Sequence, residues 1–218
     1  MSGYDTLALI GHGLLAEMTA RRLSRHCRIT LFGNLQEMRA NTRFDLALVL
    51  SDGWEPALHQ EAESLFRETK TAWLRGFAAF GEGVEGPVVR PDRPGCTQCA
   101  DARWIMAGGN RRETWKIRQQ LAERGGIKRD AWSSQISMAH MADLIENEAV
   151  RLLHGQPGRM ESSMLFVHLL SLRTTRHFVL PEPLCPVCGA LPEDSEDQAR
   201  IVLLSRPKCF PGSYRVKP

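Results

Sequence analysis

The sequence predicts an α/β fold, in which a Rossmann-like, mostly parallel sheet with flanking helices is followed by a four-cysteine knuckle region and an extended C-terminal tail. Three features of the 218 residues lead to this prediction. Short apolar runs alternate with helical segments through the first half, and parallel strands need such helical crossovers. A Gly-x-Gly turn joins the first apolar run to the first helix. Two Cys-x-x-Cys pairs stand in the second half.

The first half supplies the elements of the expected sheet in order. Apolar runs predict strands at residues 4–10, 27–32, 45–50 and 71–74. Helices are expected at 14–24 and from Trp54 to about Thr69, and Pro56 suits the first turn of the second helix. Residues 76–94 are rich in glycine and proline, so only a short strand at 86–90 is expected there.

The second half is expected to be helical between the two cysteine pairs. Helices are predicted at 101–107, 111–124 and 133–154. Either Ser133 or Ser134 is expected to cap the last helix. Strands at 163–170 and 176–180 are expected to form a hairpin or meander that returns the chain to the second cysteine pair. We expect residues 1–95 to be a Rossmann-like half, 96–192 to be a zinc-binding half of the same domain, and 193–218 to be a linker or tail.

The four paired cysteines, Cys96, Cys99, Cys185 and Cys188, predict a structural zinc site. Two residues between thiols allow both sulfurs to face one ion, and two such pairs complete a tetrahedral set of soft ligands. Two disulfides or a redox motif are the alternatives. The sequence favours neither, because no signal peptide precedes the chain and a thioredoxin-like motif needs only one pair.

The composition is that of an ordinary globular protein without a nucleic-acid or membrane signature. A formal charge of +3, scattered along the chain, argues against a nucleic-acid partner. No stretch approaches the roughly 20 apolar residues of a membrane-spanning helix. With zinc-type cysteines and no secretory leader, the reducing cytoplasm is the expected compartment.

The turn Gly11-x-Gly13 stands where a Rossmann fold binds the phosphates of a nucleotide. A tight strand-to-helix turn without a ligand explains the same residues equally well. The second strand ends in Gly33-Asn34 instead of the acid that would hold a ribose. Asp52 could bind magnesium or a ribose, but we favour it as the cap of the helix that begins near Trp54. No catalytic residue is predicted, because the sequence holds no nucleophile elbow, metalloprotease pattern or paired catalytic carboxylates.

These features together resemble the ThiF/MoeB family, the relatives of ubiquitin-activating enzymes. The segment RPDRPGCTQC at 90–99, followed by Arg103-Trp104, is similar to the ThiF-like component of azole-forming cyclodehydratases. So is LPEPLCPVCG at 180–189. The tail SRPKCFPGSYR at 205–215 resembles the lead-in to a YcaO domain in fused members.

The resemblance implies a division of labour in bacteriocin-type peptide biosynthesis. A YcaO partner, fused or separate, binds ATP and activates the peptide amide. The ThiF-like part presents the ribosomal precursor peptide for thiazoline or oxazoline formation. Members of the family commonly pair, so a homodimer is expected. A winged-helix element before the fold holds the leader peptide in that family. Since this chain begins at its first strand, leader binding is expected from another polypeptide or another part of the protein.

Departures from the adenylating members of the family separate two functional hypotheses. The acid after the second strand is missing, and neither Cys27 nor Cys209 lies where the transfer cysteine is expected. The favoured hypothesis is a zinc-stabilised, non-catalytic scaffold of the cyclodehydratase. The alternative is an ATP-dependent adenylyltransferase acting on a peptide or protein C-terminus, with Gly11, Gly13 and Asp52 around MgATP. ATP is a cofactor only under this alternative, and a dinucleotide oxidoreductase is a distant third.

Overall fold

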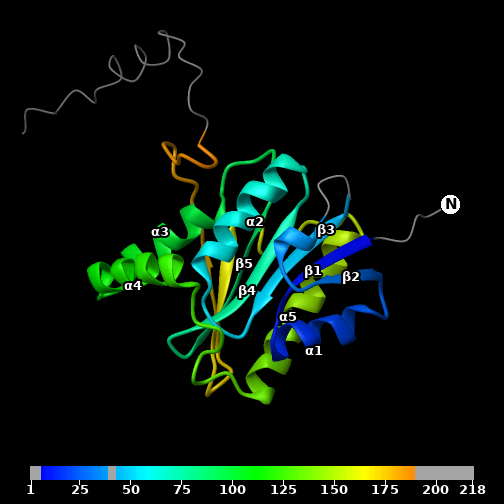
Figure 1. Cartoon of the computed structure of the whole chain (residues 1–218), viewed down its shortest axis with the longest axis horizontal. Coiled ribbons are helices and arrows are strands. Elements are labelled where there is room, and N and C mark those ends of the chain that lie inside the picture. The colour runs from blue at the N-terminus through cyan, green and yellow to red at the C-terminus, as the bar shows by residue number, and fades with distance from the viewer. Residues whose placement is uncertain (1–5, 39–42, 190–218) are drawn as a thin grey trace, which may run out of the picture.

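A seven-stranded sheet organises the chain in the computed structural model, which describes residues 6–38 and 43–189. The strand order is β2-β1-β3-β4-β5-β6-β7 (Figure 1). The strands are β1 Thr6–His12, β2 Arg28–Phe32, β3 Leu46–Ser51, β4 Trp73–Ala79, β5 Glu82–Val89, β6 Ser163–His168 and β7 Thr174–Phe178. The first four strands are mutually parallel, whereas β4, β5, β6 and β7 pair antiparallel. Five of the seven strands, β1 to β4 and β6, therefore run in one direction, which agrees with the predicted mostly parallel sheet, whereas β5 and β7 run the other way.

Helices cover both faces of the sheet, which confirms the predicted layered α/β class. The helices are α1 Leu14–Leu23, α2 Pro56–Glu68, α3 Thr97–Ala107, α4 Arg111–Arg124 and α5 Gln135–Leu153, with a short 3₁₀ turn at Leu35–Glu37. Helices α1 and α5 pack together on one face, and α2 and α3 lie on the other (Figure 1). Helix α4 packs on α2 and α3 at the periphery of the molecule.

Strand β3 lies between the hydrophobic cores on the two faces of the sheet, and every residue from Leu46 to Ser51 is buried. Its alternate side chains point to opposite faces of the sheet. Leu46, Leu48 and Leu50 join the core beneath α1 and α5, whereas Ala47 and Val49 join the core beneath α2. Burial of each leucine contributes about 1.5–3 kcal/mol, so this strand anchors both layers.

The glycine-rich stretch after the fourth strand corrects the sequence prediction. In place of a strand ending at residue 74 and a later short one, β4 continues to Ala79 and pairs with β5 across the turn Phe80-Gly81. Gly76 and Gly83 are strand residues that make room for α5. A Cβ atom at Gly76 would lie 2.8 Å from Ile145 Cδ1, and one at Gly83 would lie 2.3 Å from Met141 Sδ. The sequence pattern resembled a loop because close packing against α5 requires glycine at these two strand positions.

Helix α5 is capped by Ser134, one of the two serines that the sequence indicated. Ser134 is the N-cap, and its hydroxyl accepts a hydrogen bond from the Ser137 amide at 3.1 Å. The Ser137 hydroxyl in turn accepts one from the Ser134 amide at 3.0 Å, which completes a capping box.

Among the helices of residues 6–38 and 43–189, none combines the length and apolar character needed to span a membrane. The predicted tail at 193–218, with Cys209, lies outside the described residues.

Candidate metal centre and glycine turn

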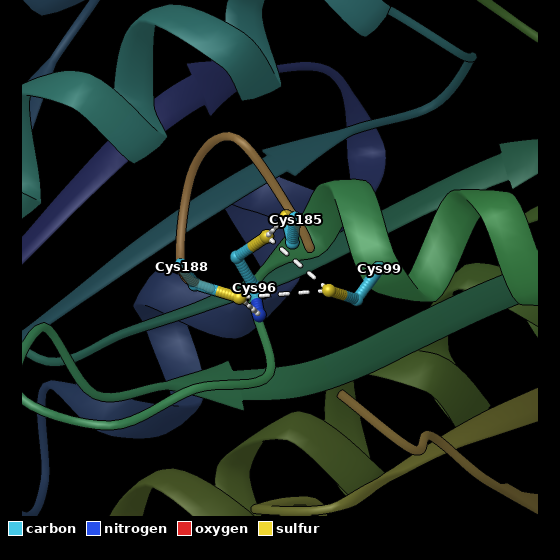
Figure 2. Close-up of side chains that lie close together, drawn as sticks. All are labelled: Cys96, Cys99, Cys185 and Cys188. Carbon is cyan, nitrogen blue, oxygen red and sulfur yellow. Dashed lines mark hydrogen bonds between the residues drawn. The ribbon is translucent and has the colours of Figure 1, made fainter. Parts of the chain in front are cut away.

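The four predicted cysteines converge at one buried point (Figure 2). Cys96 and Cys99 come from the start of α3, and Cys185 and Cys188 come from the loop after β7. All four sulfur atoms lie within 4.8 Å of one another. The Sγ–Sγ distances are 3.8 Å for Cys96–Cys99, 3.6 Å for Cys96–Cys185 and 3.5 Å for Cys99–Cys188. A metal held at about 2.3 Å from four sulfurs gives a tetrahedron with edges of about 3.8 Å, so the cluster fits such an ion.

Backbone amides around the cluster point at the sulfur atoms. The Gly95 and Cys96 amides donate to Cys188 Sγ at 3.2 and 3.4 Å, and the Glu182 amide donates to Cys99 Sγ at 3.4 Å. These donors stabilise negative charge on sulfur. The knuckle closes through the Gly189 amide, which donates to the Cys185 carbonyl at 2.8 Å. A Cβ atom at Gly189 would lie 2.6 Å from that carbonyl oxygen, so the turn requires glycine.

Burial disfavours thiolates at this point unless a cation is present. Burial raises the pKa of the Cys99 thiol to about 11 and also raises the pKa of Cys96. Burial acts the same way on Cys185, but hydrogen bonds from the Cys188 and Val187 amides bring its pKa down to about 7. A divalent ion would supply the missing positive charge. Four thiolates leave no open coordination position, so the site can hold a metal but offers no place for a reacting water.

The first cysteine pair is held in place by a carboxylate from α2. Glu63 accepts hydrogen bonds from both the amide and the hydroxyl of Thr97, at 3.1 and 2.9 Å. Thr97 is the first residue of α3, so Glu63 satisfies an otherwise unpaired donor at the helix N-terminus. This contact fixes the start of α3 without involving the cysteine sulfur atoms.

A buried ion network that sequence reasoning missed lies beneath α3. Asp101 Oδ1 lies 2.7 Å from Arg75 of β4, and its Oδ2 lies 3.0 Å from Arg118 of α4. Arg75 is fully buried and also donates to the Gly86 carbonyl. Although burial opposes ionisation, the two arginines lower the pKa of Asp101. The available signal was the position of Arg75 between the apolar residues of 71–74 and 77–80, since a buried charge needs a partner.

The glycine turn has the backbone shape predicted for it. Gly11 and Gly13 have φ values of +137° and +90°, which only glycine adopts without strain. A Cβ atom at Gly11 would lie 1.8 Å from the Leu50 carbonyl oxygen, so the turn lies directly against β3. The α1 N-terminus follows this turn.

Asp52 occupies that helix N-terminus, which corrects its predicted role as the cap of the next helix. Its carboxylate oxygens accept hydrogen bonds from the Leu14 and Leu15 amides at 2.8 and 2.9 Å. Helix α2 instead follows Glu55, whose side chain makes no cap hydrogen bond. The reason is strand order: β3 lies beside β1, so the end of β3 meets the start of α1.

A crossing segment covers Asp52 from outside. The Asp130 amide and the Ser133 hydroxyl both donate to the Asp52 carbonyl, at 2.7 and 2.9 Å. A Cβ atom at Gly53 would lie 2.1 Å from the Ile127 carbonyl oxygen. Asp52 is only 4% exposed as a result. The segment at 127–133 thus covers Asp52, while Gly11 and Gly13 remain partly exposed.

Two other polar side chains of the first half lie away from the glycine turn. Arg22 contacts Asp143 and Glu146 of α5, each at 3.1 Å, so its charge is engaged far from the glycine turn. Asn34 caps the short 3₁₀ turn by accepting a hydrogen bond from the Glu37 amide. Neither residue is brought to the α1 N-terminus.

Comparison with known proteins gives structural relatives only. No protein-family model matches the chain, and no curated protein matches it. A heterocyclase in complex with substrate and cofactor is 17% identical, with a TM-score of 0.64 over 85% of this chain. The heterocyclase TruD is 14% identical, with a TM-score of 0.63 over 85% of this chain. The Escherichia coli microcin synthetase McbBCD complex is 13% identical, with a TM-score of 0.63 over 83%.

The share of each relative's own length that this chain covers differs between them. The chain spans 26% and 28% of the two heterocyclase chains and 67% of the matched microcin synthetase chain. At these identities the likeness establishes the fold. The resemblance suggested by the two cysteine motifs is confirmed at that level: the chain has the ThiF/MoeB-like fold shared by peptide heterocyclase and microcin synthetase components.

Proposed function

We propose that this chain is a zinc-stabilised, non-catalytic ThiF-like scaffold of a peptide cyclodehydratase. In this role it presents a ribosomal precursor peptide to a YcaO partner, which forms thiazoline or oxazoline rings. The structural relatives support a role in peptide modification, since they include a heterocyclase with substrate bound and a microcin synthetase complex.

The observation that carries the non-catalytic role is the hydrogen bonding of Asp52. A Rossmann-type nucleotide site uses the amide groups at the first helix N-terminus to bind phosphate. Here the Leu14 and Leu15 amides already donate to a buried carboxylate. A phosphate would have to displace that carboxylate or lie beside its negative charge. We infer that the glycine turn is retained as a structural strand-to-helix connection.

Zinc is the ion we assign to the cysteine cluster. Four thiolates with tetrahedral spacing favour zinc among the common divalent ions, and the closed ligand set makes its role structural. The ion would join the start of α3 to the loop after β7, which are 89 residues apart along the chain. It would thereby hold the antiparallel end of the sheet against the α3–α4 region.

An adenylyltransferase is the second candidate, and the glycine geometry is what favours it. Gly11 and Gly13 keep the positive φ values of a nucleotide-binding turn. In this alternative Asp52 would turn from the α1 amides to a magnesium ion when ATP binds. The chain alone would then catalyse pyrophosphate exchange in the presence of its peptide substrate.

Reconstitution separates the two functions. The zinc-loaded chain, its YcaO partner and the precursor peptide are mixed with MgATP, and loss of water from the peptide is followed by mass spectrometry. The scaffold role predicts that the chain accelerates the partner but neither hydrolyses ATP nor exchanges pyrophosphate by itself. Full partner activity without the chain would refute the scaffold role. Peptide-dependent pyrophosphate exchange by the chain alone would establish the adenylyltransferase instead.

A further inference from the structure

A groove of about 470 Å³ lies between the end of α3 and the first turns of α4. Ile105 and Met106 of α3 and Trp115 of α4 form its apolar surface. Arg111, Arg112 and Lys116 of α4 surround them. Both helices lie on the flank of the molecule, away from the glycine turn (Figure 1). We refer to these six residues as the basic groove.

Two of the three apolar side chains of the basic groove are open to solvent, while Ile105 is buried at its base. Met106 is 59% exposed and Trp115 is 41% exposed. Arg118 is the one residue that α4 buries, so most of this helix contributes little to the core. Large apolar side chains exposed together and ringed by polar groups are typical of interaction sites.

The three cations of the basic groove lack acidic partners in the described parts of the chain. No ion pair is formed there by Arg111, Arg112 or Lys116, whereas Arg118 of the same helix binds Asp101. Between residues 97 and 126 the sequence carries six arginines or lysines against three carboxylates. The groove therefore presents positive charge that is available to a partner.

Arg111 and Arg112 stand at positions where a positive charge lowers the stability of α4. Arg111 and Arg112 form the first turn of α4, where the helix dipole already places positive charge. The N-cap residue Asn110 makes no side-chain cap hydrogen bond, so the first amide groups of α4 add to the same positive end. Helix stability would favour acidic residues at these positions.

We propose that the basic groove binds an acidic peptide segment that carries an apolar side chain. Carboxylates of the peptide pair with Arg111, Arg112 and Lys116, and the apolar side chain packs on Met106 and Trp115. A peptide fits better than a nucleic acid, because three cations around one short groove cannot follow a phosphate backbone and the chain carries only +3 overall. Only the identification of this segment as part of a precursor peptide rests on the proposed function.

Direct binding to the full-length, zinc-loaded chain tests the groove. The probe is a short fluorescein-labelled peptide in which glutamates surround a central leucine–phenylalanine pair, and fluorescence anisotropy measures its affinity. The double variant Arg111→Glu/Arg112→Glu should weaken binding by at least about tenfold, since two charge-assisted hydrogen bonds are lost. Trp115→Ala should also weaken it, and rising salt should weaken binding to the wild type.

Matched variants separate loss of binding from loss of folding. Reversing Arg111 and Arg112 complements the helix dipole, so the double variant should unfold at the same temperature as the wild type or a higher one. Lys70→Glu/Arg173→Glu changes the net charge equally at exposed positions outside the groove and should keep the wild-type affinity. Equal probe affinity for wild type and groove variants would overturn the proposal.

Other outcomes identify a different occupant and also overturn it. These are tighter binding of a lysine-containing version of the probe, tighter binding of a single-stranded oligonucleotide, and a dimer that Trp115→Ala dissociates. If the groove variants weaken probe binding as expected but the chain does not stimulate a YcaO partner, the groove proposal stands and the proposed function fails. If the partner is stimulated while groove variants bind the probe normally, the groove proposal alone fails.

Discussion

Gly13 lies directly against the carboxylate of Asp52, so that a Cβ atom at residue 13 would be 2.6 Å from Asp52 Oδ2. In a nucleotide-binding Rossmann fold, absence of this Cβ lets a phosphate approach the helix N-terminus. In this protein the same space brings the chain's own carboxylate to the Leu14 and Leu15 amides. The glycine is thus required by an internal contact, whether or not a nucleotide binds.

Asp52→Ala should destabilise the protein by about 1 kcal/mol or more, because two helix amides lose a buried acceptor. Urea unfolding of the variant measures this loss. Asp92→Ala, at an exposed position, is the matched control and should unfold like the wild type.

Calorimetric titration of the wild type with MgATP should give no binding heat, because the Asp52 carboxylate occupies the α1 amides. Saturable binding at one site per chain would revive the adenylyltransferase.

Cys185→Ser should remove the metal and destabilise the region from Cys96 onward, since one ligand of the closed set is lost. Metal content by mass spectrometry and hydrogen exchange across α3 measure the two effects. Cys27→Ser is the control, because Cys27 lies outside the cluster, and it should keep one metal ion per chain. Full metal content in the Cys185 variant would contradict the four-cysteine assignment.

Metal affinity should increase as pH rises. Burial raises the pKa of both Cys96 and Cys99, the latter to about 11, so binding at neutral pH must displace both protons. Each displaced proton makes affinity rise by about tenfold per pH unit. Below the pKa of about 7 for Cys185, a further proton must leave, so the dependence should steepen. Competition with a chromogenic chelator across this range measures it, and a flat profile would contradict thiolate ligation.

Asp101→Asn should cost about 3–5 kcal/mol of stability, because Arg75 is left buried without its charge partner. Equilibrium unfolding in urea gives this value. Asp143→Asn provides the comparison, since Asp143 pairs with Arg22 at the surface and its loss should cost no more than about 1 kcal/mol. Equal effects in the two variants would show that the Asp101 network does not hold α3 and α4 to β4.

The sequence by itself determined the features that depend on local pattern. Alternation of apolar runs and helical segments predicted the parallel half of the sheet, and the spacing of four cysteines predicted the metal-ligand set. Ser134 was among its expected caps, because capping involves residues within one helical turn. Each of these follows from neighbours along the chain.

Only the tertiary structure decided which distant groups meet. Strand order placed Asp52, which follows β3, at the start of α1, and packing against α5 required glycine at strand positions 76 and 83. The same holds for Asp101, whose partners Arg75 and Arg118 come from β4 and α4. Periodicity shows that a side chain is buried, but the partner of a buried charge depends on how the layers pack, which no local pattern records.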